Sequence, residues 1–179
     1  ADEDVPILVP EINPEHLGLA STQASRWGGA IVAGPNCATA GLVTTLKPLE
    51  GFGLNRVSVT TFQAISGAGR RGLAALDIAG NVIPFIRNEE EKIDRETRKI
   101  LGRAEQGAIA PLPLEIAASC GRVPVREGHL MSIDVEFHEK PDADRILSSL
   151  NGFRSKPQDL GLPTAPKRPI ILRTEEDRP

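Results

Sequence analysis

The chain has 179 residues, of which 40% are hydrophobic and 25% charged, enough for one sizeable globular domain. Its net charge of −3 and its aromatic content of 3%, with no tyrosine, exclude a basic or base-stacking surface for nucleic acid. No apolar run approaches the ~20 residues that span a bilayer, and the acidic start at residues 1–4 predicts no signal peptide. Two cysteines without a Cys-x-x-Cys pair favour a reducing cytoplasm, and the three scattered histidines predict no metal site.

The first segment predicts a strand and then a helix. Residues 5–12 are apolar and interrupted by proline, which is typical of a short or edge strand. Asn13 and Pro14 are typical of a helix start, because asparagine caps well and proline fits the first helical position.

Cys37 stands where the sequence predicts the start of a second helix. A short apolar strand over residues 31–33 leads into a Gly-Pro-Asn turn, and a helical run follows through Lys47. Pro48 is expected to end that run, because it has no N–H to donate. Free N–H groups and the positive end of the helix dipole favour the thiolate, which is the nucleophilic form of cysteine. The alternative is an inert, buried cysteine that only fills space.

The middle of the chain predicts a strand, a small-residue turn and the most regular helix. Residues 56–63 alternate between two faces, and the turn over residues 66–69 allows close approach of a backbone or ligand. Residues 73–86 are apolar without a clear period. A helix is predicted over residues 88–101, with Asn88 as its N-cap in a capping box.

The last third predicts two strands, a helix and a final strand. The strands are expected over residues 116–125 and 130–138, and the second alternates as a half-exposed antiparallel strand does. A short helix over residues 142–151 and a proline-rich connection over residues 154–169 lead to a last strand over residues 170–172. The pattern as a whole indicates a strand-rich α+β domain.

Three sets of charged or titratable residues are candidates for chemistry. His129 lies at a turn between two predicted strands, and an imidazole can move protons near neutral pH. Arg122 could clamp a carboxylate with its planar fork. Glu89 and Lys92 share one helix face, where they could bind a zwitterionic or phosphorylated group. Each also has an ordinary alternative, namely a solvated histidine, a surface ion pair and a charged helix face.

Four motifs in this order resemble the aspartate-semialdehyde dehydrogenases of the archaeal and fungal branch. They are Gly-Pro-Asn-Cys at residues 34–37, Phe-Gln-Ala-Ile-Ser-Gly-Ala-Gly at 62–69, Glu-Glu-Glu-Lys at 89–92 and Arg-Val-Pro-Val-x-x-Gly-His at 122–129. The resemblance covers residues 5–135. It implies an α+β fold like the C-terminal domain of glyceraldehyde-3-phosphate dehydrogenase, with a mixed, largely antiparallel sheet and helices packed on one face.

The resemblance also implies roles in catalysis and cofactor binding. Cys37 would be the nucleophile that forms a thioacyl-enzyme, and His129 would be the acid–base residue. Gln63 would orient the bound intermediate. Ser66 and Gly67 would contact the nicotinamide of NADP.

For the substrate, the resemblance implies 4-phospho-L-aspartate. Asn36 would help to bind its phosphate, while Glu89, Lys92 and Arg122 would hold the amino acid portion and the phosphate. NADPH would reduce the thioester to aspartate 4-semialdehyde, a precursor of lysine, threonine and methionine. Gly34 and Ala38, which flank the Pro-Asn-Cys motif, and the pair Leu130-Met131 after His129 depart from the usual family pattern.

The expected organisation is a fragment of such an enzyme. Residues 1–34 resemble the end of an N-terminal dinucleotide-binding domain, and residues 35–179 resemble a catalytic and dimerisation domain with an incomplete C-terminal end. No Gly-x-Gly-x-x-Gly turn is present within residues 1–34. A homodimer or homotetramer is expected, with the apolar residues 73–86 at the subunit contact, and the isolated chain is expected to be inactive as a reductase.

Three alternatives remain open from the sequence. One is a related reductase, such as a malonyl-CoA reductase or an N-acetyl-glutamyl-phosphate reductase, which uses the same thioester chemistry. Another is a dimer-forming module without its own activity. The third is a thiol hydrolase, which would need a cysteine–histidine pair oriented by a third residue and no cofactor.

Overall fold

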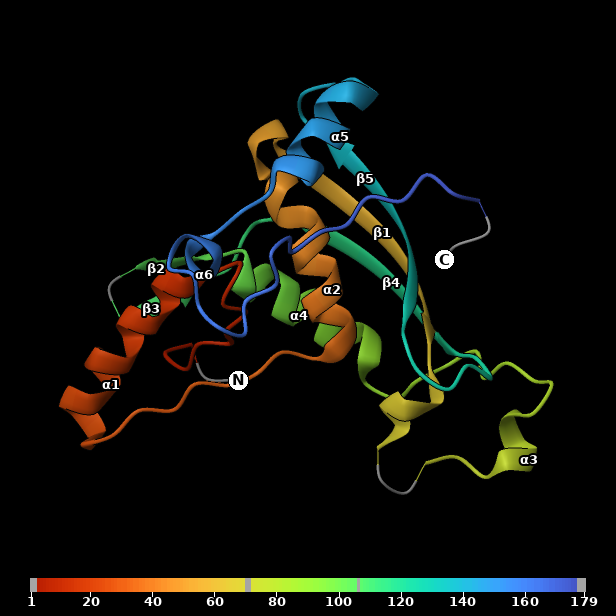
Figure 1. Cartoon of the computed structure of the whole chain (residues 1–179). Helices are drawn as coiled ribbons and strands as arrows, with labels where there is room; N and C mark the ends of the chain where they lie inside the picture. Colours follow the sequence, from red (N-terminus) through yellow and green to blue (C-terminus); the bar gives the residue numbers. More distant parts are fainter. Residues whose placement is uncertain (1–2, 70–71, 106, 177–179) are drawn as a thin grey trace.

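A three-stranded sheet forms the centre of the molecule in the computed structural model, which describes residues 3–69, 72–105 and 107–176. Its strands are β1 (Leu54–Gln63), β4 (Glu115–Arg122) and β5 (Leu130–Phe137), in the order β4-β1-β5. Strand β1 runs parallel to β4 and antiparallel to β5 (Figure 1). The mixed sheet with helices confirms the expected α+β class.

The register of the sheet brings three chain segments together at one end. Gln63, the last residue of β1, pairs with Arg122, the last residue of β4. Phe62 pairs with Leu130, the first residue of β5. His129 directly precedes Leu130, so the predicted acid–base residue lies at the same end as Gln63 and Arg122.

Two helices, α2 (Cys37–Leu46) and α4 (Glu89–Ile100), cover one face of the sheet (Figure 1). Both predicted helices are thereby confirmed. Their apolar positions recur at three- and four-residue spacing, which places one stripe of each helix in the core. Full burial of such a side chain contributes about 1.5–3 kcal/mol relative to an exposed position. The fully buried apolar residues of α2, α4 and β1 are Leu42, Val43, Leu46, Ile93, Ile100, Val57 and Val59.

The other face of the sheet carries small polar side chains at its centre and the exposed apolar residues Phe62 and Leu130 at one end. Thr60 lies at its centre, where it pairs with Ser119 of β4 and Ser132 of β5, and all three are exposed. Strand β5 alternates between exposed and half-buried residues, which confirms the half-exposed antiparallel strand.

Shorter elements surround this central unit. They are η1 (Pro14–Leu17), α1 (Gly18–Trp27), η2 (Lys47–Phe52), η3 (Ile65–Ala68), α3 (Ala75–Ile78), β2 (Arg103–Glu105), β3 (Ala108–Ala110), α5 (Ala143–Gly152) and α6 (Lys156–Asp159). No helix within the described residues is long and apolar enough to cross a membrane.

The N-terminal segment is joined to the end of α4 by a buried polar chain. The side-chain amide of Asn13 donates to the carbonyl of Ile7 at 2.8 Å and lies 2.9 Å from Nδ1 of His16. The other ring nitrogen of His16 lies 3.1 Å from the carbonyl oxygen of Gly102. Both Asn13 and His16 are completely buried. Residues 7–16 are therefore packed against the central unit.

Several strand predictions at the two ends of the chain were wrong. Residues 5–12 and 31–33 contribute only the parallel bridge between Ile7 and Ala33, and residues 170–172 form no strand. Parallel strands need further neighbours in a sheet to become regular, and the described residues provide none here. Strand β4 also ends at Arg122, three residues before the predicted limit.

Candidate active site

Cys37 is the first residue of helix α2, as the sequence predicts. The preceding residue, Asn36, caps the helix, because its side-chain oxygen accepts hydrogen bonds from the N–H groups of Ala38 at 2.9 Å and Thr39 at 3.1 Å. Cys37 is exposed. Its thiol is therefore accessible to solvent beside the positive end of the helix dipole.

His129 contacts the Cys37 thiol directly. Its Nε2 lies 3.1 Å from Sγ of Cys37. The other ring nitrogen, Nδ1, accepts a hydrogen bond from the backbone N–H of Ala64 at 3.1 Å. Residues that are 92 positions apart in the sequence thus form a pair suited to proton transfer.

A buried carboxylate connects the nucleophile helix to β1. One oxygen of Glu89, Oε1, accepts hydrogen bonds from the amides of Gln63 at 2.8 Å and Asn36 at 2.9 Å. Gln63 and Glu89 are both buried. The backbone N–H of Asn36 donates to Oε2 of Glu96 at 2.7 Å, one residue before Cys37. Helix α4 therefore fixes the position of the residue that caps α2.

Arg122 is buried at the same end of the sheet and remains 7% exposed. Its Nη1 donates to the carbonyl oxygen of Ala64 at 2.6 Å, which is its only side-chain hydrogen bond to the residues the structure describes. The other guanidinium nitrogens are left to bind an anion in planar geometry.

The remaining predicted site residues lie at the border of this cluster. Ser66 and Gly67 belong to the turn η3, and both are exposed. A Cβ atom at Gly67 would lie 2.9 Å from Nη1 of Arg122 and 3.2 Å from Cε1 of His129, so a larger residue there would displace the ends of these side chains. Lys92 follows Glu89 by one helical turn and is exposed.

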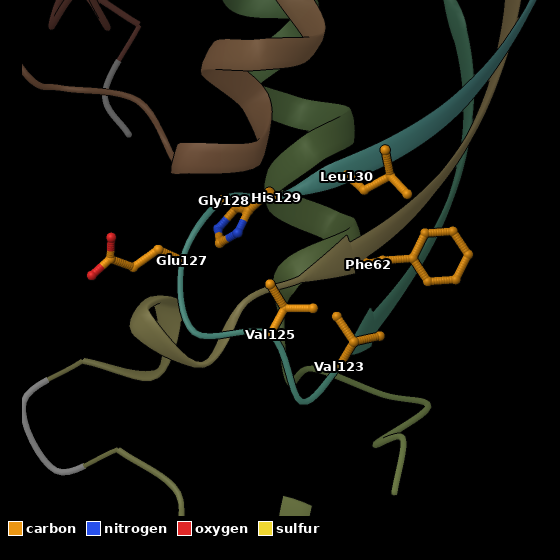
Figure 2. Close-up of a pocket in the computed structure, with 7 residues that line it drawn as sticks. All are labelled: Phe62, Val123, Val125, Glu127, Gly128, His129 and Leu130. Atoms are coloured by element: carbon orange, nitrogen blue, oxygen red, sulfur yellow. The ribbon is translucent and has the colours of Figure 1, made fainter. Parts of the chain in front are cut away.

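An apolar pocket of about 520 Å³ borders His129. In Figure 2 the Glu127 side chain points away from the apolar side chains. The residues that line it are Phe62, Val123, Val125, Glu127, Gly128, His129 and Leu130.

Cys120 differs from Cys37 in its exposure to solvent. It is buried in β4, and burial raises the pKa of its thiol, with the Glu90 and Glu89 carboxylates acting in the same direction. Its backbone N–H donates to Oε1 of Glu90 at 3.1 Å.

Sequence reasoning missed two members of the cluster, Ala64 and Glu96. Ala64 acts only through its backbone, so its side chain gives no signal. Glu96 lies two helical turns after Glu89 on the same face of α4, and that spacing is the signal that could have identified it.

The arrangement defines a domain with an exposed, helix-capped thiol beside a histidine. Comparison with known proteins gives its family. The family model of the semialdehyde dehydrogenase dimerisation domain matches residues 46–179. The chain belongs to this family.

Named relatives agree with that placement. The chain is 44% identical over 181 residues to an aspartate-semialdehyde dehydrogenase of Methanothermobacter thermautotrophicus, with 99% of this chain and 52% of the relative covered. A malonyl-CoA reductase (NADP) of Metallosphaera sedula is 37% identical over 183 residues, with 99% and 51% covered. The solved structure of aspartate semialdehyde dehydrogenase with NADP from Candida albicans matches with a TM-score of 0.88 at 36% identity, with 99% and 53% covered. The chain thus spans about half the length of these relatives.

Proposed function

We propose that this chain is the catalytic part of an NADPH-dependent enzyme that converts 4-phospho-L-aspartate to L-aspartate 4-semialdehyde. The reaction would serve lysine, threonine and methionine biosynthesis. The observation that carries the proposal is the 3.1 Å contact between Sγ of Cys37 and Nε2 of His129 at the start of α2. A cytoplasmic location fits, because Cys37 must remain a free thiol.

In the proposed reaction, the Cys37 thiolate attacks the acyl carbon of the substrate. A carbon–sulfur bond forms, and the carbon–oxygen bond to phosphate breaks, with phosphate taking the electron pair. Covalent catalysis thus divides one difficult step into two easier ones. The Gln63 amide, held by Glu89 at 2.8 Å, orients the acyl group. His129 protonates the oxygen of the hemithioacetal that forms when a hydride adds to the thioester. It takes this proton back as the carbon–sulfur bond breaks, which releases the aldehyde and returns the electron pair to the Cys37 thiolate.

The turn η3 fits the nicotinamide end of NADP. Ser66 and Gly67 are exposed, and Gly67 packs against the tips of Arg122 and His129, so a flat ring can approach the site over a backbone without side chains. When bound, the cofactor supplies the hydride that reduces the thioester. Within this proposal, residues 1–34 end the dinucleotide-binding domain, and residues 35–179 form the catalytic and dimerisation domain.

The charges of the site support a substrate that carries both an ammonium and a carboxylate. Glu89 is a buried carboxylate whose Oε1 accepts hydrogen bonds from two neutral amides, and a buried negative charge gains most from a cation. The free guanidinium nitrogens of Arg122 suit the α-carboxylate. Asn36 and Lys92 would bind the phosphate.

A substrate comparison in the full-length enzyme tests this assignment. We expect turnover of aspartate 4-semialdehyde with phosphate and NADP, and a higher KM after Glu89→Gln, which removes the charge that binds the ammonium. Glu91→Gln is the matched control, because Glu91 is exposed on the same helix. Faster turnover of malonyl-CoA, with no effect of Glu89→Gln, would instead favour the malonyl-CoA reductase function suggested by the Metallosphaera relative.

We also propose that the chain forms a homo-oligomer, at least a dimer, through the open face of the sheet and the apolar residues 73–86, of which Leu76, Val82 and Phe85 are exposed. The small side chains of Thr60, Ser119 and Ser132 leave the centre of that face flat, which allows a second sheet to pack on it. Thr60→Arg should yield monomers in sedimentation at tens of micromolar, whereas Ser148→Arg on the exposed side of α5 should not. Identical sedimentation of the two variants would contradict this interface.

A further inference from the structure

Exposed apolar residues lie side by side across one end of the open face of the sheet. Phe62 of β1 pairs with Leu130 of β5 and with Gly121 of β4. Phe62 is 39% exposed and Leu130 is 55% exposed. Paired residues point to the same face of a sheet, so all three lie on the face opposite helices α2 and α4.

A loop segment continues this arrangement beyond β4. Ile83 forms an antiparallel bridge with Arg122, through two backbone hydrogen bonds of 3.0 and 2.8 Å. The next residue, Pro84, therefore lies opposite Gly121 on the open face. Pro84 is exposed, and Val82, on the same side of the segment, is 54% exposed. We call Leu130, Phe62, Gly121 and Pro84 the apolar row.

Each strand residue of the apolar row is the chain neighbour of a residue of the candidate site. The neighbouring pairs are Phe62 with Gln63, Gly121 with Arg122, and Leu130 with His129. Successive side chains point to opposite faces of a sheet, so the row lies on one face and the site on the other. In Figure 2 the Phe62 and Leu130 side chains extend to one side and the His129 ring to the other. One layer of backbone therefore separates the row from the site.

We infer that a second copy of this chain packs on the apolar row, and that this contact holds the candidate site in its active arrangement. The family to which the chain belongs is a dimerisation domain, and its model includes every residue of the row. The row is also continuous with Thr60 at the centre of the open face. The inference rests on the homo-oligomer proposed above, and it adds that the site is incomplete without the second copy.

The chemistry of this surface fits a second apolar surface rather than a substrate. The pocket of about 520 Å³ beside the row is lined mainly by apolar side chains. Cys37 begins α2, which covers the opposite face of the sheet (Figure 1), so the row does not belong to the substrate site. Removing exposed apolar surface from water drives association, and such surfaces commonly mark contacts between proteins.

The site depends on the ends of three strands, where a sheet is least constrained. Gln63 and Arg122 end β1 and β4, and Leu130 begins β5. Within the part of the chain that the structure describes, only Ile83 ties residues 79–85 to the sheet by backbone hydrogen bonds. Strand ends and loops open locally more readily than strand centres. A partner that packs on the row restricts these motions from the back of the site.

Dilution of the full-length enzyme tests whether the second copy is needed. We expect its specific activity in NADP reduction to fall together with the assembled fraction measured by sedimentation. A displacement of about 1 Å can cost about 10²-fold in rate, so monomers should be at least about tenfold less active. If the wild type does not dissociate, the monomeric Thr60→Arg variant provides the comparison, with Ser148→Arg as its control. Full activity of the monomer would overturn the inference.

A copy without the nucleophile tests whether the second chain acts only by packing. Cys37→Ser lacks the thiol but keeps the apolar row. In excess, it should raise the activity of dilute wild-type chains at least about tenfold, back to the level of the assembled enzyme. The double variant Cys37→Ser with Thr60→Arg is the control that cannot assemble, and it should have no effect. Mixed oligomers without restored activity would contradict the inference.

A third test needs no turnover and uses the 179-residue chain. Phe62→Ala should raise the dissociation constant of the oligomer at least about tenfold, as an aromatic residue at the centre of a contact does. It should also speed hydrogen exchange over residues 120–130 but not in α5. Leu160→Ala is the matched control, because Leu160 is 61% exposed outside the row. An unchanged dissociation constant in Phe62→Ala would overturn the inference.

The contact and the proposed reaction fail in different ways. A full-length oligomer that loosens in Phe62→Ala, yet does not reduce NADP with aspartate 4-semialdehyde, would refute the proposed substrate and leave the contact intact. A monomer that is fully active on aspartate 4-semialdehyde would refute the contact and leave the reaction intact.

Discussion

Cys37 and Cys120 provide an internal comparison of two thiols in one chain. Cys37 is exposed at a helix start, and Cys120 is buried with its thiol pKa raised. Because the thiolate is the reactive form, we expect iodoacetamide to label Cys37 at least about tenfold faster at neutral pH. Peptide mass mapping measures both labelling rates. The control is the chain unfolded in urea, in which the two rates should converge. Equal rates in the folded chain would remove the basis for a nucleophile at Cys37.

His129 and Arg122 should have separable effects on the kinetics of the full-length enzyme. His129→Asn removes the proton donor beside Cys37 and should lower kcat by roughly 10²–10⁴-fold. Arg122→Lys keeps the charge but loses the planar fork, so it should mainly raise KM. Near-unchanged melting temperatures would show that both variants fold.

The kinetic result also separates two roles of Arg122. A loss confined to KM assigns Arg122 to the substrate carboxylate. A loss confined to kcat assigns it to the position of Ala64, whose carbonyl it binds. Wild-type kcat in His129→Asn from about pH 6 to about pH 9 would contradict an acid–base role.

At the scale of single elements, the start of α4 depends on an unusual backbone conformation. Asn88 has φ 61° and makes no capping hydrogen bond with its side chain, so the predicted capping box was wrong. Asparagine enters this left-handed region more readily than most residues, and glycine enters it without cost. The turn presents Glu89, the next residue, to Asn36 and Gln63.

This conformation predicts opposite signs for two substitutions. Asn88→Gly should keep or raise the free energy of unfolding by up to about 1 kcal/mol, whereas Asn88→Ala should lower it by about 1–2 kcal/mol. Urea titration of both variants measures the difference. A greater stability of the alanine variant would show that Asn88 is not held in the left-handed region.

The sequence predicted elements whose signals are local. Helices α2 and α4 and strands β1 and β5 carry regular apolar periods, and they lie where those periods place them. Residues 5–12 and 170–172 have the composition of strands but lack neighbours in the described sheet, and composition does not reveal a missing neighbour. The hairpin of β2 and β3 is too short to show a period.

The candidate site shows the same division between local and distant information. The helix-start position of Cys37 follows from a few neighbouring residues. Its contact with His129 does not, because it depends on the register that aligns the ends of β1, β4 and β5. The resemblance supplied the pairing, and the roles of all these residues stay predictions until the kinetic tests are done.

At the scale of the whole molecule, one buried histidine links stability to pH. Burial lowers the pKa of His16 from its ordinary value of 6.5, against smaller opposing effects of Gly102 and Glu15. Below that ordinary value the unfolded chain binds a proton that the folded chain does not. The contribution of His16 to the free energy of unfolding is therefore fully present above about pH 6.5, and it falls as the pH drops toward the pKa of His16 in the folded chain.

Urea unfolding between about pH 7.5 and about pH 5.5 measures the slope of the free energy of unfolding against pH. We expect His16→Gln to be less stable at neutral pH but to lose less stability on acidification than the wild type. His138→Gln, at an exposed position, should keep the wild-type slope. An unchanged slope in His16→Gln would show that other groups cause the acid sensitivity.

The central claim is that chemistry proceeds through a thioester on Cys37, and trapping that species tests it most directly. The full-length enzyme is mixed with aspartate 4-semialdehyde and NADP without phosphate, quenched in acid and digested for mass spectrometry. We expect the aspartyl group on the peptide that contains Cys37, its absence from Cys37→Ser, and its disappearance when phosphate is added before the quench. NADP reduction without any acyl group on Cys37, or an acyl group on Cys120 instead, would contradict the account.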